Sequence, residues 1–463
     1  ARTYENIRLS NQGMRGKGEI DFITSTIYSK DFVYYPDSVA AYGTGGVIRP
    51  GEANGSSYPE AVLGPYRMHW EPRIDSMFLR NIRKPFKFYN ATAELDGAVN
   101  ITSRGVYGVG TMLTRGSRAV SQELTFKEFS YGARHAKFAI LTNNPDKPAM
   151  AGDDIRLNFD LKNGTALIQP EKAGVAALSF PYAQMRTSIT NAVWNLDDST
   201  VTMTKPKNVP IASSYFYTTR KDLDSLAFNA EQATYDFNSR ELNVKGIPYI
   251  IVADAKIIPE NNETTILENF ELQSFNNAEL IIDTLNAYHY LYNGEVKIIS
   301  RNKFIGSAMY RLVSGADTFA IKFDQFVLSE VFVDGKPKLM TTSGGEVLAK
   351  ENLIIAPGFY YKGAAKMFAY KKALELNGAV KLMLSDPAYD YWILFERKDN
   401  NPEIAIDVET ALYDNEDPVV AGDVAGSSYR GPAAVDLSLV HLSEPTRQAA
   451  RSYDVFCVNK YTF

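Results

Sequence analysis

Residues 95–129, LDGAVNITSRGVYGVGTMLTRGSRAVSQELTFKEF, decide the fold of this chain. Apolar and polar side chains alternate along Ala98–Ser103 and again along Leu124–Phe129, which is the two-residue period of a half-buried β-strand. Glycines interrupt the alternation at Gly105, Gly108 and Gly110. The stretch therefore predicts a strand, a tight glycine turn, a second strand, a short polar link and a third strand.

The same strand–glycine–strand module recurs along the chain. Copies lie at Asn6–Tyr35 and Glu295–Phe326, and a looser copy lies at Asn352–Leu384. Repetition of one β module implies serially paired strands that bury a shared face. We therefore predict an all-β fold whose repeats form an elongated β-solenoid or a curved open sheet, with β-sandwich domains as the alternative.

The chain divides by composition into regions. We expect a repetitive β region at residues 1–132, a middle β region at 133–262 and further β repeats at 263–425. Residues 36–60 are rich in Gly, Pro and Ser, which predicts a long loop inside the first region. Residues 426–463 lack the alternation, and their run SEPTRQAARSYDVFC resembles a translated sequencing adapter. We therefore expect this tail to be non-native or disordered.

One hairpin can be predicted residue by residue. Ile155–Leu161 alternates cleanly, and Asn163 followed by Gly164 is a strong hairpin signal into Thr165–Gln169. The side chains predicted to share one face are Leu157, Phe159, Leu161, Ala166 and Ile168.

Composition excludes several classes of protein. The 463 residues carry 49 basic and 54 acidic side chains, a net charge of −5, which excludes a nucleic-acid binder driven by overall positive charge. No run of about 18 apolar residues exists, so we expect no transmembrane helix. Cys457 is the single cysteine, so no intrachain disulfide can form. Because the chain begins at Ala1 without a methionine, we interpret it as an internal fragment whose targeting segment, if any, lies upstream.

One cluster mixes an imidazole, an aromatic ring and carboxylates: His69, Trp70, Glu71 and Asp75. A glycan-binding or acid–base site would use such neighbours, with the ring as a platform and the carboxylates for proton transfer. The simpler interpretation is a His and a Trp at a sheet edge, because no second His lies nearby in the sequence.

Other motifs of catalysis or metal binding are missing from the sequence. It has no HExxH, no paired-cysteine spacing and no GxSxG. The doublets Asp153-Asp154 and Asp197-Asp198 are explained by turns, and His135 and His289 are isolated. We therefore predict no catalytic residue, no metal site, no cofactor and no enzymatic activity.

Three motifs and the opening stretch carry a resemblance: SKDFVYYPDS at Ser29–Ser38, VADAKIIP at Val252–Pro259 and YHYLYNGEVKIISR at Tyr288–Arg301. With them the chain resembles a group of very large, uncharacterised Bacteroidota envelope proteins, over residues 4–422. More weakly, its repeats are similar to those of AsmA/TamB-type proteins. That family implies a curved sheet whose apolar concave face conducts lipid. Residues that would line one continuous groove are Val99, Ile101, Val109, Ile298 and Ile355.

The sequence therefore predicts a non-enzymatic structural or bridging β protein of a bacterial cell envelope, in the periplasm or on the outer surface. Lipid or envelope proteins would be its partners. A glycan-binding or carbohydrate-active β protein and a viral or extracellular fibre protein remain as alternatives.

Overall fold

A computed structural model describes residues 2–395, apart from 5, 12, 145, 173–174, 315–316, 334 and 386–389, together with 411–413 and 418–420. The predicted non-native tail at 426–463 lies outside these residues. Strands make up 65% of the structure and helical turns 5%, and within the described residues no helix reaches seven residues. The all-β, repetitive prediction is therefore confirmed.

The contacts divide the chain into two compact units. Unit 1 comprises Ala1–Lys221, Ala227–Ile247 and Thr264–Glu271. Unit 2 comprises Asp222–Leu226, Pro248–Glu263 and Leu272–Phe463. Each unit is described by itself below.

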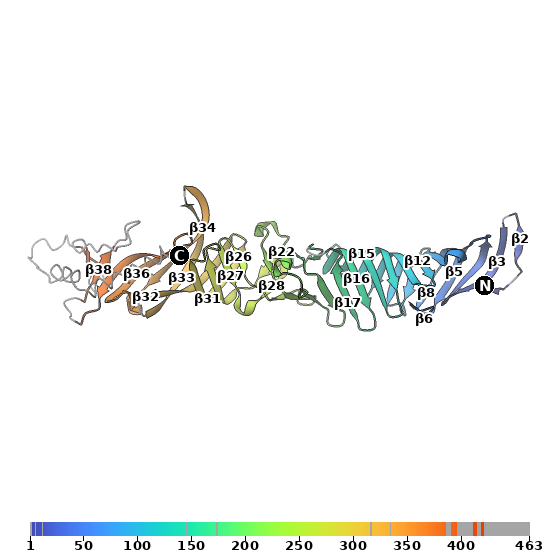
Figure 1. Cartoon of the computed structure of the whole chain (residues 1–463), viewed down its shortest axis with the longest axis horizontal. Helices are drawn as coiled ribbons and strands as arrows, with labels where there is room; N and C mark the ends of the chain where they lie inside the picture. Colours follow the sequence, from blue (N-terminus) through green and yellow to red (C-terminus); the bar gives the residue numbers. More distant parts are fainter. Residues whose placement is uncertain are drawn as a thin grey trace, which may run out of the picture. The chain divides into compact units, whose positions relative to one another are not determined.

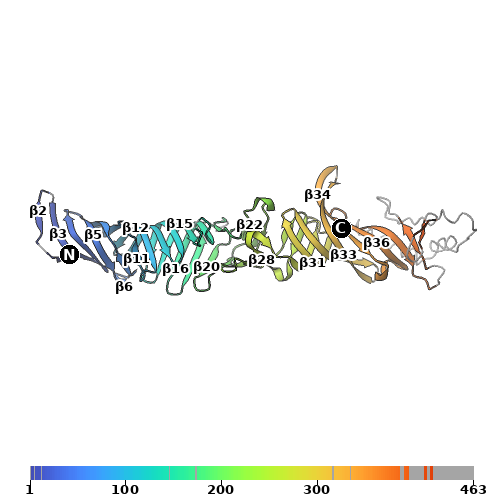
Figure 2. The ribbon, with the colours of Figure 1, turned by 180° about the vertical axis from the view of Figure 1, so that it is seen from behind.

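The strands of unit 1 follow one another along the unit and run across it, in both the front and the rear view (Figures 1 and 2). They are β1 (Arg2–Thr3), β2 (Arg8–Ser10), β3 (Gly13–Phe22), β4 (Ser25–Tyr34), β5 (Val39–Ile48), β6 (Gly51–Ala53), β7 (Ser56–Tyr58), β8 (Ala61–Leu63), β9 (Tyr66–Glu71), β10 (Ser76–Asn81), β11 (Phe86–Phe88), β12 (Ala93–Thr102), β13 (Gly105–Thr114), β14 (Ser117–Phe126), β15 (Ser130–Ile140), β16 (Met150–Asp160), β17 (Thr165–Pro170), β18 (Leu178–Phe180), β19 (Met185–Thr187), β20 (Asn191–Asn195), β21 (Thr200–Thr204), β22 (Tyr215–Thr218), β23 (Ala227–Asn229), β24 (Gln232–Asp236) and β25 (Leu242–Lys245). Short 3₁₀ turns are η1 (Pro72–Ile74), η2 (Ile211–Ser213) and η3 (Lys221–Leu223), which ends in unit 2.

The long strands of unit 1 bend in the middle. In β14, the buried side chains alternate through Ser117, Ala119 and Ser121, and the alternation then resumes one residue out of phase at Leu124 and Phe126. The pairing register shifts near the same level between β13 and β14 and between β15 and β16. Such β-bulges bend a strand while keeping the same face buried. The sheet therefore folds along a row of bulges so that its two halves bury a common core.

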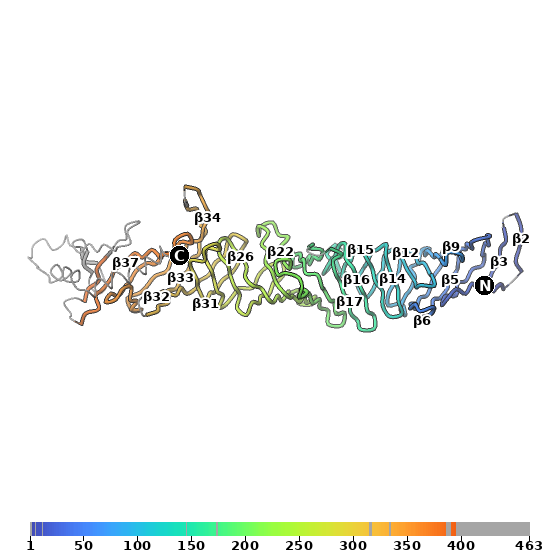
Figure 3. Tube along the Cα trace, viewed as in Figure 1, coloured from blue at the N-terminus to red at the C-terminus, as the bar shows by residue number. Residues whose placement is uncertain are grey.

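The two halves form separate layers at two places. Between β5 and β12, layer A contains β8 and β11 and layer B contains β9 and β10. The halves separate again at β16. Ile155–Asp160 pairs with β17, whereas Ala151 and Gly152 pair with β18. Layer A continues from β18 through β19, β22 and β23, and layer B continues from β17 through β20, β21, β24 and β25. Successive hairpins therefore alternate between the layers. Figure 3 shows the trace of the chain through β15, β16, β17 and β22.

Aromatic side chains join the two layers of unit 1. Phe88 on the layer A side stacks on Phe126 on the layer B side, with ring centroids 4.6 Å apart. Further along, Phe180 of layer A lies 4.9 Å from Tyr235 of layer B. All four rings are at most 2% exposed, and burial of such a side chain stabilises a fold by roughly 1.5–3 kcal/mol. The cross-layer rings thus form the core of the unit.

The four sequence modules share one structural device. In each, the central strand carries a glycine at which a Cβ atom would lie 2.0–2.5 Å from a backbone oxygen of the neighbouring strand. These glycines are Gly18 in β3, Gly110 in β13, Gly306 in β32 (Lys303–Ser314) and Gly363 in β36 (Phe359–Phe368). Each module is a three-stranded antiparallel meander. The recurring glycines therefore permit a close approach of two backbones that any side chain would prevent.

Unit 2 repeats the antiparallel arrangement with longer strands. Its remaining strands are β26 (Ile250–Val252), β27 (Ala255–Ile258), β30 (Phe275–Ile282), β31 (His289–Ser300), β33 (Asp317–Val333), β34 (Lys336–Val347), β35 (Leu353–Ala356), β37 (Glu375–Leu382), β38 (Trp392–Phe395), β39 (Ala411–Tyr413) and β40 (Pro418–Val420). Residues of both units contribute to β28 (Glu263–Leu267) and β29 (Glu271–Leu272). The 3₁₀ turns η4 (Glu260–Asn262), η5 (Glu268–Phe270) and η6 (Ala349–Glu351) complete the helical segments of the described chain.

Two local predictions have different outcomes. The 155–169 hairpin is confirmed, since Leu157 pairs with Ile168 and Phe159 with Ala166. Residues 36–60 are not a long loop, because β5, β6 and β7 occupy most of this range. Gly43 there serves close packing, since a Cβ atom on it would lie 1.7 Å from the ring of Tyr66. Gly43 thus makes room for the Tyr66 ring within a strand and does not end the strand, as the loop prediction assumed.

Candidate functional site

The predicted His69–Asp75 cluster is split between two faces of a strand. His69 and Glu71 lie on the outer face of β9, where His69 Nε2 is 2.8 Å from Glu71 Oε1. Trp70 points to the opposite face and lies 5.4 Å from the Phe22 ring, and its indole N–H is buried without a partner among the described residues. Because neighbouring residues of a strand face opposite sides, Trp70 cannot form a stacking platform beside His69 and Glu71.

Asp75 connects two turns. It follows η1 with φ +55° and accepts hydrogen bonds from the backbone N–H of Ser103, at 2.9 Å, and from the Ser103 hydroxyl. Ser103 belongs to the turn between β12 and β13. This carboxylate therefore fastens the β9–β10 turn to the neighbouring hairpin, away from the His69–Glu71 pair.

The residues predicted to line an apolar groove occupy different environments. Val99 and Ile101 of unit 1 and Ile298 and Ile355 of unit 2 are at most 5% exposed and belong to the cores of their units. Val109, across the ladder from Ala98, is 36% exposed and faces outward. In unit 1, a groove lined by Val99 and Ile101 would require the layers to open.

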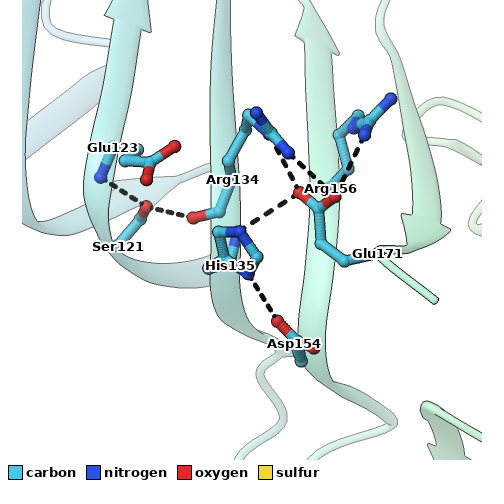
Figure 4. Close-up of polar contacts among 7 residues, drawn as sticks. All are labelled: Ser121, Glu123, Arg134, His135, Asp154, Arg156 and Glu171. Atoms are coloured by element: carbon cyan, nitrogen blue, oxygen red, sulfur yellow. Dashed lines mark hydrogen bonds and ion pairs between the residues drawn. The ribbon is translucent and has the colours of Figure 1, made fainter.

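A polar network lies at the fold line between the layers (Figure 4). Glu171, directly after β17, has a side chain only 5% exposed. Its carboxylate accepts hydrogen bonds from Arg134 Nε at 3.2 Å and Nη2 at 3.3 Å, from Arg156 Nη2 at 3.0 Å, and from the backbone N–H of His135 at 3.4 Å. The hydrogen bond from Arg134 is the largest cause that lowers the pKa of Glu171 to about 2, and Arg156 acts in the same direction.

The same network holds the bend of two strands. His135 in β15 and Asp154 in β16 both have positive φ, +46° and +52°, and His135 Nδ1 lies 2.8 Å from Asp154 Oδ1. Ser121 donates to the carbonyl of Arg134 at 2.6 Å and accepts the N–H of Glu123 at 2.9 Å (Figure 4). These contacts satisfy the backbone groups that the bulges release from the ladder. The sequence predicted Asp154 only as part of a turn and His135 as isolated.

In unit 2, His289 is fully buried at the start of β31. Its Nε2 lies 2.7 Å from the carbonyl oxygen of Lys371 and 3.2 Å from that of Phe368, so this nitrogen carries a proton and donates. Its Nδ1 is buried without a partner in the described part of the chain. Burial lowers the pKa of His289, which keeps the imidazole neutral.

A row of register partners runs along the outer face of layer B. From β9 to β20 its members are His69, Phe78, Asn100, Tyr107, Thr125, Gly132, Asn158, Leu167 and Val193. None of them is buried, and Phe78 and Tyr107 are 44% and 42% exposed. These two exposed rings, which lie two strand spacings apart, are the surface feature closest to a ligand platform in this layer. The alternation of apolar and polar residues in these strands implies that Phe78 and Tyr107 point outward, but the sequence analysis selected Trp70 instead.

The described residues contain neither a candidate metal-binding cluster nor a helix that could span a membrane. No group of three or more His, Cys, Asp or Glu side chains there could hold a metal ion. No helical segment in these ranges has the length and apolarity required to span a bilayer. Comparisons with family models, with curated proteins and with solved structures found no match to this chain.

Proposed function

We propose that this chain is a non-enzymatic structural protein whose stacked β-strands hold other parts of a bacterial cell envelope at a fixed separation. One observation supports the proposal above others. Fifteen strands of unit 1 form an unbroken hydrogen-bonded series, namely β3, β4, β5, β9, β10, β12, β13, β14, β15, β16, β17, β20, β21, β24 and β25.

The strand series gives unit 1 a defined dimension. Fourteen spacings of about 4.8 Å each add up to roughly 65 Å, less any shortening by twist. The cross-layer rings and the Glu171 network couple the two layers, so that the strands of one layer cannot separate without exposing the core. A spacer of fixed length needs this kind of coupling. The resemblance to large Bacteroidota envelope proteins supports the cellular location, with envelope proteins or lipid as partners.

Amide hydrogen exchange of the full chain tests the structural role. A spacer with one coupled core should exchange the central amides of β12–β16 only through global unfolding, with equal opening free energies across these strands. If the amides of β13 or β14 exchanged through local opening of that strand alone, at a free energy several kcal/mol below that of global unfolding, the structural role would be contradicted. Such local opening is characteristic of lids and binding segments rather than of a scaffold.

Glycan binding is a second candidate, which the exposed rings of Phe78 and Tyr107 favour. These side chains lie two strand spacings apart, about 10 Å, on the outer face of layer B. Titration with neutral oligosaccharides, followed by tryptophan fluorescence and calorimetry, tests it. Saturable heat that Phe78→Ala and Tyr107→Ala abolish, and that Phe129→Ala (54% exposed, outside the row) leaves intact, would support this candidate. No heat from any oligosaccharide would reject it.

A further inference from the structure

A hollow of about 400 Å³ lies on the outer face of layer A, opposite the row that contains Phe78. Its floor follows one line of register partners: Ala139 in β15, Ala151 in β16 and Ser179 in β18. These side chains are short, and the flanking partners on the same line are long, Arg118 in β14 and Arg186 in β19. Short side chains between long ones on a sheet surface leave a depression.

The lining of the hollow is strongly basic. Its charged members are Arg118, Lys137, Arg186 and Asp153, so three positive charges and one negative charge give a net of +2. This contrasts with the net charge of −5 of the whole chain. Among the described residues, no acidic side chain lies within ion-pair distance of Arg118, Lys137 or Arg186. Elsewhere in the unit, Arg134 and Arg156 are both paired with Glu171.

One donor of a lining residue is also left without a partner among the described residues. The Nε atom of Arg186 is inaccessible to solvent and has no hydrogen-bond acceptor within the described chain. This donor is desolvated without compensation from the described residues, and such a guanidinium donor destabilises the folded state. An oxyanion is the acceptor that a guanidinium binds most strongly.

We propose that this hollow binds a small ligand through an oxyanionic group: a carboxylate, sulfate or phosphate. Arg118, Lys137 and Arg186 supply the charge, and the floor of Ala139, Ala151 and Ser179 leaves room for the body of the ligand. The volume lies within the range of small-molecule sites, about 300–1,000 Å³. The proposal is independent of the structural role, because a scaffold can also carry a binding site on its surface.

Calorimetric titration of the full chain tests the proposal, at an ionic strength held constant with sodium chloride. The probes are sodium sulfate, sodium phosphate, sodium glucuronate and neutral glucose. We expect saturable binding of at least one oxyanion and none of glucose. Tighter binding of glucuronate than of sulfate would assign the site to an acidic sugar, and the reverse order would assign it to a free inorganic oxyanion. No saturable heat from any oxyanion up to about 50 mM would overturn the proposal.

Variants locate the binding. Arg118→Met with Arg186→Met should weaken the affinity by about tenfold or more, because two charge-assisted contacts are lost while the apolar stems remain. Arg67→Met with Arg80→Met, which removes the same charge from exposed positions of layer B, should change it by less than about twofold. Ala151→Leu should abolish glucuronate binding by filling the floor. Equal losses in the two arginine pairs, or unchanged binding in Ala151→Leu, would show that the hollow is not the site.

Discussion

Substitution of Gly110 by alanine tests the device that the repeated modules share. Gly110 has φ +136°, a backbone conformation that L side chains rarely adopt, and its Cβ atom would lie 2.3 Å from the carbonyl oxygen of Asp96 and 2.8 Å from Gly97 Cα. Both contacts are with backbone, so no flexible side chain can move aside. The strands β12 and β13 must therefore separate or the backbone must change conformation.

The size of the effect follows from these two costs. A strained backbone conformation costs about 1–3 kcal/mol. Separation of the strands at this crossing breaks one or two ladder hydrogen bonds, at about 1 kcal/mol each. Gly110→Ala should therefore lower the free energy of unfolding by about 2–5 kcal/mol, a large part of the 5–15 kcal/mol of an ordinary domain.

Urea denaturation of the full chain, followed by circular dichroism and tryptophan fluorescence, measures this change. Gly97→Ala is a second probe of the same crossing, because its Cβ atom would lie 2.0 Å from the carbonyl oxygen of Val109. Gly64→Ala is the matched control: no atom lies within 4 Å of its Cβ position, and its stability should change by less than about 0.5 kcal/mol. A loss below about 1 kcal/mol for Gly110→Ala would refute the role given to these glycines.

Three further predictions concern the core and the buried ionisable groups. Phe126→Ala should cost about 3–5 kcal/mol in unfolding free energy, because the cross-layer stack on Phe88 is replaced by a cavity, whereas Phe129→Ala at an exposed position should cost less than about 0.5 kcal/mol. The pKa of Glu171 is held at about 2, against an ordinary value of 4.5, so this carboxylate contributes stability above pH 4.5 that is lost as the pH falls toward 2. Glu171→Gln should lower the free energy of unfolding at pH 7 by about 1.5–3 kcal/mol and flatten its dependence on acidic pH. The control, Glu52→Gln at an exposed position, should leave this pH dependence unchanged. Because the pKa of His289 is lowered in the folded chain, the unfolded chain takes up a proton first as the pH falls. The free energy of unfolding should therefore fall by up to about 1.4 kcal/mol per pH unit below pH 6.5. His289→Gln keeps an N–H donor and should remove this pH dependence, which urea midpoints at pH 7 and pH 5 would measure.

The strands and their modules could be predicted because their signals are local. Alternation, turn residues and mid-strand glycines all act within about ten residues of sequence. In the 155–169 hairpin they predicted that Leu157, Phe159, Ala166 and Ile168 share one face, which the pairing confirms. Residues 36–60 do not form the predicted loop, in part because Gly43 packs against Tyr66, which lies in a different strand. The sequence alone does not distinguish a glycine that makes room for an aromatic ring from a glycine that ends a strand.

The two layers and the surface sites could not be predicted, because they depend on contacts between distant residues. Phe88 meets Phe126 only after the sheet has folded along its bulges, and no composition signal marks that line. Likewise, the hollow joins Arg118 to Arg186 through three intervening strands, and each residue alone is an ordinary surface arginine. His69 and Trp70 are neighbours in sequence, yet the strand places them on opposite faces.

The distance between spin labels along one outer row tests the stacked-strand scaffold most directly. With Cys457 replaced by serine, labels at positions 69, 125 and 193 report on His69, Thr125 and Val193, each an exposed member of the same row. Four strand spacings separate each successive pair, so we predict about 19 Å for 69–125, about 19 Å for 125–193 and nearly their sum for 69–193, all with narrow distributions. A 69–193 distance no longer than the 69–125 or the 125–193 distance, or a broad distribution of distances, would contradict the stacked-strand scaffold.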